Sequence, residues 1–242
     1  MHIIKLSAID STNDYLKQLI SNQVVSNFTV VVTDSQNKGK GQMGSVWFSE
    51  SGKNLTFSVL IKDLIIDVQQ LFTLNIVISL AIITVFEKYR IPQLRVKWPN
   101  DIMSGNHKIG GILIENSFKS DGEVYSIVGI GLNINQMNFD TLPKASSLKL
   151  ITGLDYNLAN LLSEFCQSIQ QFVQRMYAQT DSIWDLYHQK LFKIGVPMAF
   201  EDKYGKKFMG IIQSVSKDGL LTILMEDDLQ VSFAIKEVKM LY

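Results

Sequence analysis

The sequence predicts an α+β fold in which a mixed or antiparallel sheet is flanked by helices and followed by a small antiparallel β-barrel. Three observations support this prediction. Short β-branched runs, such as residues 28–33 and 55–61, have the pattern of buried strands. Two long helical patterns, at residues 68–89 and 157–177, lie between runs of this kind. After Ile194 the chain changes to short strands that are separated by turn residues.

Composition limits the class of protein. The 242 residues are 46% hydrophobic, so the chain can bury a substantial core. The 23 basic and 23 acidic residues give a formal net charge of zero without long runs of either sign, which argues against a surface for nucleic acid. Cys166 is the single cysteine, so it cannot form an intramolecular disulfide, and it fits a reducing cytoplasm.

The chain has neither the pattern of a signal peptide nor that of a transmembrane helix. Residues 1–10 lack a long apolar core and a small-residue cleavage site. The most apolar stretch, residues 76–86, contains Ser79 and Thr84 and is shorter than the about 20 residues that span a bilayer. We therefore expect a soluble, cytoplasmic protein without a membrane partner.

The first elements are a short strand at residues 3–6 and a helix that follows Asp10-Ser11-Thr12-Asn13. Apolar residues at helical spacing, from Tyr15 to Ile20, come directly after this polar group. Hydroxyl and carboxylate side chains are typical N-caps, which is one interpretation of Ser11 and Thr12. A helix N-terminus also presents free backbone donors, so that a cap and a ligand contact are compatible.

A glycine-rich loop separates the strands at residues 28–33 and 55–61. It spans residues 34–54, which is an uncommon length for a connection that has no function. Its centre, QNKGKGQMGSVW, ends at Trp47. Glycines allow a close approach of the backbone to an anion, and lysines add charge for phosphate. A flexible linker would have a similar composition, and Trp47 could equally be a core residue.

Residues 94–116 predict a β-hairpin that starts with an alternating apolar and basic strand closed by a proline. Turn signals follow at residues 100–106, and a β-branched strand opened by two glycines comes after them. Glycine at a strand start usually indicates that something approaches the backbone closely. The hairpin therefore places Lys97, Asp101 and Lys108 near a surface of glycine. The alternative is that these charges are solvated on an outer face.

The remaining elements complete the predicted sheet and its helices. Residues 123–132 form a strand that ends in Gly129-Ile130-Gly131, where the glycines indicate a ligand or a neighbouring backbone close by. The amphipathic helix at 157–177 carries Cys166 beside its apolar face, as inert packing, and a shorter helix spans 182–192. The three histidines are too scattered for a zinc site, and His107 is expected in an exposed turn.

The sequence KWPND at residues 97–101, followed by KIGGILIE at 108–115, resembles the signature of biotin–protein ligases. These enzymes adenylate biotin and attach it to a lysine of a carboxylase carrier domain. The D-S-T-N sequence, the glycine loop and G-x-G-x-N at 129–133 resemble further motifs of this family in the same order. The resemblance implies a catalytic core like that of class II aminoacyl-tRNA synthetases over residues 1–192. It also implies an SH3-like domain over residues 193–242.

The resemblance implies that the enzyme is a biotin–[acetyl-CoA-carboxylase] ligase whose substrates are biotin and ATP. It also implies Mg²⁺ on the phosphates, but the sequence does not identify protein ligands for the metal. The biotin site is expected at Ser11, Thr12, Asn13, Gln36, Gly39, Lys40, Gly41, Lys108, Gly111 and Gly129. The ATP or adenylate site is expected at Gln42, Trp47, Asn133 and Lys108. Lys108 is the expected catalytic cation, and Asp101 is expected to take or steer the proton of the acceptor lysine.

The glycine loop departs from the usual family pattern, G-R-G-R-x-G-R-x-W. Its three glycines and Trp47 are retained, whereas Lys40, Gln42 and Ser45 stand where the family has arginine. Lysine retains the charge without the bidentate fork, and glutamine and serine retain only hydrogen bonding. We therefore expect phosphate neutralisation to depend more on Lys40 and Lys108.

The implied partner is a biotin carboxyl carrier protein or domain of a carboxylase. Some family members carry an N-terminal winged helix, but this chain begins directly at the catalytic domain, so we expect no binding to DNA. The oligomeric state stays open, with a homodimer as one alternative. A lipoate or octanoate ligase or transferase of the same fold is a second interpretation, against which KWPND and the tryptophan-terminated loop argue. A non-catalytic module that sequesters biotin or a carrier domain is a third, which Lys108 and Asp101 disfavour.

Overall fold

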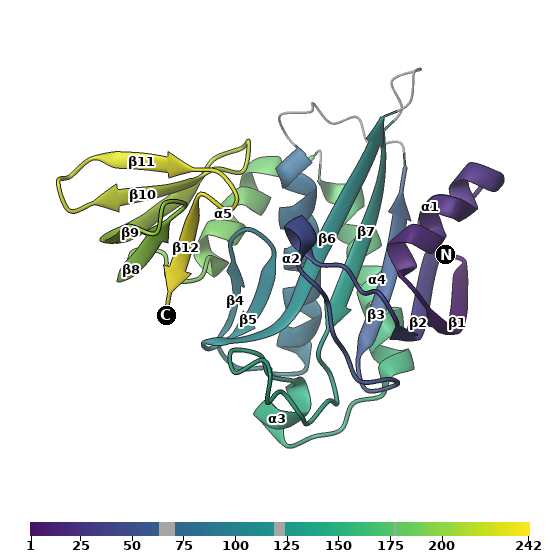
Figure 1. Ribbon diagram of the computed structural model, residues 1–242. Helices are drawn as coiled ribbons and strands as arrows, with labels where there is room; N and C mark the ends of the chain where they lie inside the picture. Colours follow the sequence, from purple (N-terminus) through teal and green to yellow (C-terminus); the bar gives the residue numbers. More distant parts are fainter. Residues whose placement is uncertain (63–70, 119–123, 177) are drawn as a thin grey trace.

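The computed structural model describes residues 1–62, 71–118, 124–176 and 178–242 (Figure 1). Its main sheet has seven strands in the order β1-β2-β3-β7-β6-β5-β4. Strands β1 and β2 are parallel and the other neighbours are antiparallel, so the predicted mixed sheet is confirmed. The strands are β1 (Ile3–Ile9), β2 (Val30–Gln36), β3 (Leu55–Ile61), β4 (Leu94–Lys97), β5 (Asp101–Ser104), β6 (His107–Phe118) and β7 (Val124–Leu132).

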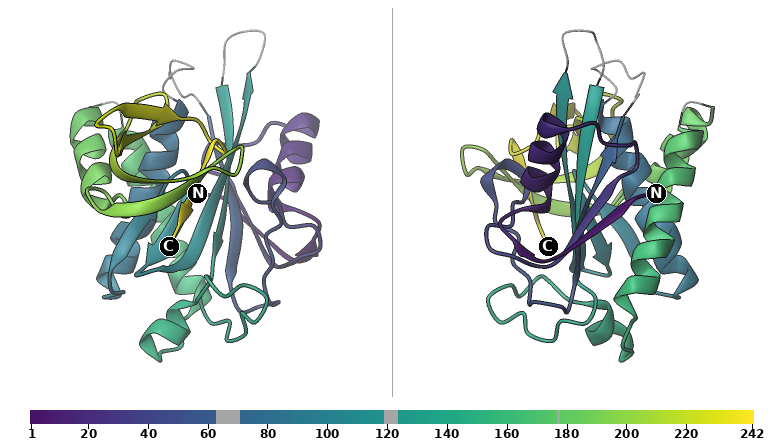
Figure 2. Two further views of the ribbon diagram at one scale, coloured as in Figure 1. Left: turned by 60° about the vertical axis from the view of Figure 1, so that its left-hand side comes forward. Right: turned by 90° about the vertical axis from the view of Figure 1, so that its right-hand side faces the viewer.

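Helices cover both faces of the main sheet (Figure 2). Helix α1 (Thr12–Asn22) lies over β2, β3 and β7 on one face. Helices α2 (Leu71–Lys88) and α4 (Leu158–Arg175) pack against each other on the opposite face, and α5 (Thr180–Lys190) packs against α2 and β4. The described residues also form the short helix α3 (Leu148–Thr152) and the 3₁₀ turn η1 (Gln42–Gly44).

Strand β3 shows how the sheet separates two hydrophobic clusters. Successive strand residues point to opposite faces. Phe57, Val59 and Ile61 belong to the large cluster that includes α2 and α4, whereas Leu60 packs with α1. The rings of Phe57 and Phe165 stack with their centroids 6.5 Å apart, which fastens α4 to the sheet. Both faces of β3 are therefore buried, which explains its continuous apolar sequence.

Helix α2 is the apolar core helix that the sequence predicts, but it is longer than the 76–86 stretch used to argue against a membrane span. Its 18 residues are long and apolar enough to cross a membrane by composition alone. However, 72% of that window is buried inside the protein, against the sheet, α4 and α5. Burial on all sides accounts for its apolar surface. Val68 of the predicted helix, like Glu123 and Tyr177 at other predicted ends, lies outside the described residues.

The predicted hairpin contains three strands rather than two. Strands β4 and β5 pair across a turn that contains the cis peptide bond between Trp98 and Pro99. Strands β5 and β6 join at Gly105, whose φ of +57° suits glycine. Asp101 is therefore the first residue of β5 and pairs in register with Lys97 on one side, instead of lying in a turn. The extra strand places the Asp101 carboxylate between β4 and β6.

The chain ends in a five-stranded antiparallel sheet, as predicted, with the order β11-β10-β9-β8-β12. The division of the chain into domains at residue 193 stays a prediction. The strands are β8 (Pro197–Asp202), β9 (Lys207–Val215), β10 (Leu221–Met225), β11 (Gln230–Phe233) and β12 (Val238–Leu241).

The second sheet is attached beside the hairpin through a buried hydrogen bond. The indole Nε1 of Trp98 donates to the carbonyl oxygen of Gly219 at 2.9 Å. Gly219 has a φ of +87°, which L side chains rarely adopt. Nearby, the rings of Phe192 and Tyr242 pack with their centroids 5.1 Å apart. These contacts hold β12 next to the hairpin (Figure 1).

Replacing Trp98 with phenylalanine should weaken the fold, because it leaves the Gly219 carbonyl without its buried donor. We expect Trp98→Phe to lower the free energy of unfolding by about 1–3 kcal/mol more than Trp184→Phe does. Trp184 is the matched control, since it is also buried but its Nε1 has no hydrogen-bond partner among the described residues. Urea denaturation followed by circular dichroism measures both variants. Equal losses would show that the Trp98 bond contributes nothing.

Candidate functional site

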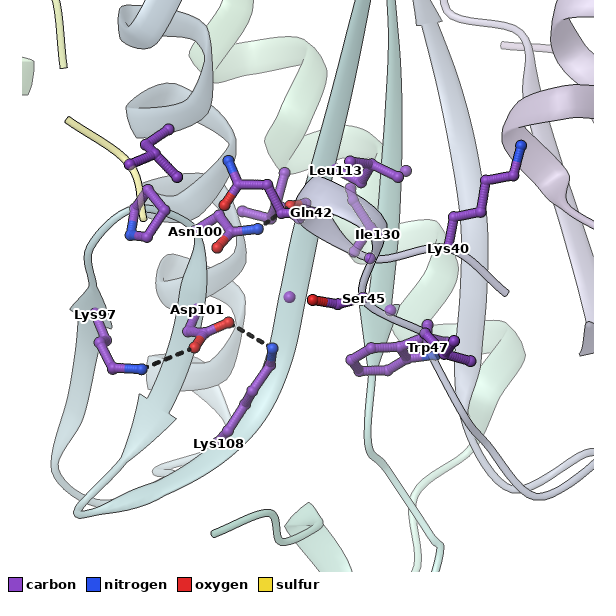
Figure 3. A pocket seen from close by; sticks show the side chains of 18 of the residues that line it. Lys40, Gln42, Ser45, Trp47, Lys97, Asn100, Asp101, Lys108, Leu113 and Ile130 are labelled. Carbon is purple, nitrogen blue, oxygen red and sulfur yellow. Dashed lines mark hydrogen bonds and ion pairs between the residues drawn. The ribbon is translucent and has the colours of Figure 1, made fainter. Parts of the chain in front are cut away.

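A cavity of about 600 Å³ opens between the main sheet, the glycine loop and the second sheet (Figure 3). Its floor comes from β6 and β7, and its sides come from the N-terminus of α1, the loop at residues 40–47 and the hairpin. Residues 235–240, in and just before β12, close the remaining side. Segments from both ends of the chain therefore meet at one site.

Three glycines of the floor lie directly beneath side chains of this chain. A Cβ atom at Gly131 would lie 2.3 Å from Trp47, and one at Gly129 would lie 2.6 Å from the Oδ1 of Asn13. A Cβ at Gly111 would lie 3.3 Å from the Lys108 ammonium. The prediction that something approaches the backbone closely is confirmed at Gly111, whereas Gly129 and Gly131 face side chains and not the expected ligand or neighbouring backbone. Here the approaching groups are the chain's own side chains, and larger residues at Gly129 or Gly131 would displace them.

Trp47 lines the cavity instead of belonging to the hydrophobic core. Its indole lies over Gly131, and the Lys108 ammonium is 5.8 Å from the centre of the ring. Its buried Nε1 has no hydrogen-bond partner among the described residues. The Trp47 backbone N–H donates to the Gly39 carbonyl at 3.0 Å, so the loop closes on itself. Gly39 serves this closure and does not line the cavity.

The hairpin side of the cavity carries one carboxylate between two ammonium groups (Figure 3). The Asp101 oxygens lie 2.5 Å from the Lys108 Nζ and 3.3 Å from the Lys97 Nζ. Only 14% of the Asp101 side chain is exposed. Lys236 and Lys239 line the adjoining side. Cations outnumber carboxylates at this end of the cavity, which suits an anionic ligand.

Lys40 lies on the other side of the cavity and does not join Lys108. Its ammonium is 2.6 Å from the Asp14 carboxylate on α1, and Figure 3 shows it directed away from Asp101. The hydrogen bond to Asp14 raises the pKa of Lys40, so the side chain stays charged, but Asp14 compensates that charge. Lys40, Gln42 and Ser45 all line the cavity. The loop therefore brings uncharged hydrogen-bonding groups to the cavity, and its lysine pairs with α1.

We call the part of the cavity that is lined by the uncharged side chains of Ser11, Thr12, Asn13 and Gln36 its neutral end. The predicted residues at the start of α1 gather there. Ser11 is the N-cap, because its hydroxyl accepts from the Asp14 backbone N–H at 3.3 Å. The Thr12 backbone N–H donates to the Gln36 Oε1 at 2.8 Å. Ser11, Thr12 and Asn13 are buried, and all three line the cavity with Gln36 and Gly129. The capping and ligand interpretations are thus compatible in space.

Two of the predicted site residues lie outside the cavity. Gly39 closes the loop, and Asn133 is used internally. The Asn133 Nδ2 donates to the Ser146 carbonyl at 3.1 Å, and its backbone N–H donates to the Ile109 carbonyl at 2.8 Å. Asn133 therefore links β6 to the segment that contains Ser146. Its expected contact with the adenylate stays a prediction.

Sequence reasoning missed the contribution of the C-terminal sheet. Lys236, Lys239 and Met240 line the cavity although they are far from the hairpin in sequence. Their spacing contains no motif that could identify them. Thr56 and Asn100 also line it without having been assigned a role. These residues could be found only from the tertiary arrangement.

Other titratable candidates lie apart from this chemistry. Cys166 is buried, and burial raises the pKa of its thiol to about 11, so the predicted inert packing is confirmed. His107 is exposed, as predicted, at the first residue of β6. Within the described ranges, groups of three or more His, Cys, Asp or Glu side chains that could hold a metal ion are absent.

Comparison with known proteins identifies the family. Residues 6–135 match the biotin/lipoate A/B protein ligase family. The chain belongs to this family. The bifunctional ligase/repressor BirA of Bacillus spizizenii is 26% identical over 237 residues, which cover 95% of this chain and 71% of that protein. The biotin–[acetyl-CoA-carboxylase] ligase of Mycobacterium tuberculosis is 24% identical, over 80% of this chain and 72% of that protein.

A solved structure agrees over nearly the whole chain. The biotin protein ligase from Aquifex aeolicus in complex with biotin and ATP has a TM-score of 0.81 and 27% sequence identity. The match covers 99% of this chain and 98% of that one. The match therefore includes both sheets of the present chain. It confirms the resemblance to biotin–protein ligases that KWPND and the sequence of β6 indicate.

Adding a methyl group at Gly131 should expel the Trp47 indole from the floor, because the new Cβ would lie 2.3 Å from the ring. Gly131 does not have a positive φ, so alanine is compatible with the backbone. We expect the tryptophan emission of Gly131→Ala to shift to longer wavelength as the indole becomes solvated. The shift should vanish when Gly131→Ala is made in a Trp47→Phe background. A shift that persists in this background would come from another tryptophan and would contradict the position of the Trp47 indole over Gly131.

Proposed function

We propose that this chain is a biotin–protein ligase that converts biotin and ATP to biotinyl-5′-AMP and then transfers biotin to a lysine of a carboxyl carrier protein or domain. Its family and its full-length likeness to biotin protein ligases support the assignment. The observation that carries it is the division of one cavity into a neutral hydrogen-bonding end at α1 and a cationic end at Lys108. A ligand with a polar ring and a carboxylate fits this division.

In the first step, the carboxylate of biotin attacks the α-phosphorus of ATP and pyrophosphate leaves. Negative charge accumulates on the non-bridging oxygens, and fixed cations in a site that excludes water stabilise it. Lys108 is our candidate, because its ammonium lies at the cavity floor beside Gly111. The partly buried Asp101 carboxylate keeps Lys108 in position before the substrates arrive. Trp47, which lies beside Lys108, is the candidate to cover the adenine ring.

We propose that Mg²⁺ enters with ATP as part of the substrate. The described residues offer no cluster of protein ligands for a resident ion, so the triphosphate itself is the ligand we assign. The lysines of the hairpin and of β12 then complement the phosphate charge that remains. We also propose a cytoplasmic location, where ATP and carboxylases are present, and the balanced net charge gives no reason to propose a nucleic acid partner.

In the second step, the amine of the acceptor lysine attacks the mixed anhydride and AMP leaves. The amine must be neutral to attack, so a carboxylate that accepts its proton promotes transfer. Asp101 is suitably placed, because it lies in the same cavity and already accepts hydrogen bonds from ammonium groups.

The nearest alternative within the family is activation of lipoate or octanoate. The neutral end of the cavity argues against it, because Thr12 and Asn13 are buried polar groups and Gln36 beside them is half-buried. An alkyl chain or a dithiolane ring would offer these groups no hydrogen bond beyond those they make within the protein, and sites of this kind reject ligands that lack the matching polar atoms. A non-catalytic module that sequesters biotin is the alternative from another class.

Pyrophosphate release by the purified protein tests the assignment. With ATP and Mg²⁺ and without an acceptor protein, we expect a burst with biotin and none with lipoate, octanoate or no acid. Lys108→Ala should raise the barrier to adenylation by about 3 kcal/mol or more, as does the loss of one oxyanion donor. Lys149→Ala is the control, since Lys149 pairs with Asp155 on the surface. A burst with lipoate or octanoate would move the function within the family, and near-native adenylation by Lys108→Ala would refute the role of Lys108.

Asp101→Asn should slow transfer from preformed biotinyl-5′-AMP to a carrier domain, because an amide cannot accept the proton of the acceptor lysine. Asparagine retains the size and hydrogen-bonding reach of the side chain, so the loss reports on the carboxylate. The measurement is single-turnover transfer of labelled biotin, with the rate of adenylation determined separately. Full retention of transfer from preformed adenylate would eliminate Asp101 as the proton acceptor.

A further inference from the structure

A chain of hydrogen bonds lies directly behind the neutral end of the cavity. The Asn13 Nδ2 donates to the Glu115 Oε2 at 2.7 Å, and the Lys17 ammonium lies 2.5 Å from the other Glu115 oxygen. On the other side of the amide, the Ser58 hydroxyl donates to the Asn13 Oδ1 at 2.6 Å. Asn13 lines the cavity, whereas Glu115, Lys17 and Ser58 do not. Glu115 and Lys17 therefore act on a ligand only through Asn13, whereas Ser58 also donates to the Thr12 hydroxyl, which lines the cavity.

Glu115 determines which way the Asn13 amide faces. The two ends of an amide are nearly identical in shape but opposite in hydrogen bonding. A carboxylate is only an acceptor, so it holds the NH₂ group of Asn13 on its own side. The amide oxygen is consequently turned to Ser58 and to the floor. In this orientation the oxygen is the Asn13 atom closest to the position of a Cβ at Gly129, at 2.6 Å.

The orientation fixes the chemistry that this end of the cavity offers. An amide oxygen has two acceptor positions, and Ser58 occupies one of them. The second is available to an N–H group of a ligand at Gly129. Asn13 is only 3% exposed, so an acceptor left unpaired by a ligand there would be costly. A flipped amide would present NH₂ and repel the same N–H group.

We propose that Glu115 is a positioning residue for biotin recognition, which fixes the Asn13 amide so that its oxygen accepts from a ureido N–H. This inference rests on the proposed function, and it adds a residue of β6 that does not touch the substrate. Lys17 completes this chain of interactions, because its ammonium compensates the Glu115 charge on the side away from the cavity. Glu115 and Asn13 thus set specificity for a ring that carries N–H donors.

Glu115→Gln tests the proposal, because a glutamine side chain can accept from or donate to Asn13 and no longer fixes its amide. We expect the Kd and KM for biotin to rise by about tenfold, the equivalent of one hydrogen bond. The kcat at saturating biotin and the KM for ATP should not change. Glu164→Gln is the matched control, since Glu164 also accepts a hydrogen bond, from Tyr89, and lies near a lysine, but on α4.

Exchanging the two groups provides the rescue. In Asn13→Asp/Glu115→Gln, the new glutamine donates to the new carboxylate, which again presents an oxygen at Gly129, and the net charge is unchanged. We expect the biotin Kd of the double variant to return to within about threefold of the parent value. Asn13→Asp alone places two carboxylates side by side, so it should bind biotin more weakly than the parent and the double variant do. A merely structural role would lower the melting temperature and kcat without this recovery.

The outcomes separate this inference from the function on which it rests. Calorimetry gives the Kd for biotin without ATP, and pyrophosphate release reports catalysis. A parent chain that binds biotin without releasing pyrophosphate overturns the proposed ligase activity, and the changes in Kd still test Glu115. Unchanged biotin affinity in Glu115→Gln, or a double variant as weak as Asn13→Asp, overturns the role of Glu115. A parent chain that does not bind biotin overturns both.

Discussion

The site depends on one carboxylate that is shared by two ammonium groups. Lys97 and Lys108 come from different strands and would repel each other across the hairpin without Asp101 between them. A partly buried carboxylate holds such a pair more firmly than a solvated one, because water screens it less. Strand β5 exists as a separate element to bring Asp101 to this position, and β12 shields the group by closing the cavity beside it. Both sheets are therefore needed for one electrostatic arrangement.

Three positions of the floor are glycine because other side chains of the chain occupy the space where their own side chains would lie. Gly129 admits the Asn13 amide, Gly131 admits the Trp47 indole and Gly111 admits the Lys108 ammonium. Glycine weakens a strand, and β6 and β7 tolerate it because each is paired on both sides within the seven-stranded sheet. The sheet thus supplies rigidity that the glycines alone would remove. A neutral end and a charged end can then lie on neighbouring strands of the same sheet.

Local patterns predicted most of the fold, since periodicity and caps report on short segments. The helix that begins after Ser11, the buried helix α2 and the glycine-bearing strands were all readable in this way. The third strand of the hairpin was not, because Asn100-Asp101 has turn chemistry and only its pairing with β4 and β6 makes Asp101 a strand residue. The approach of Lys239 to the cavity was equally unreadable, because no local pattern records which distant segments meet.

The replacement of loop arginines changes where the cavity obtains its charge. A lysine offers a single ammonium on a flexible stem, and Asp14 on α1 captures the one at Lys40. The loop is then left with Gln42 and Ser45, which offer hydrogen bonds without charge. Apart from Lys40, which Asp14 compensates, the cations of the cavity therefore belong to the hairpin and to the segment that contains β12. Since these segments sit on the two sheets, the charge is part of the folded framework instead of the loop. A phosphate ligand consequently meets cations that the two sheets hold in position.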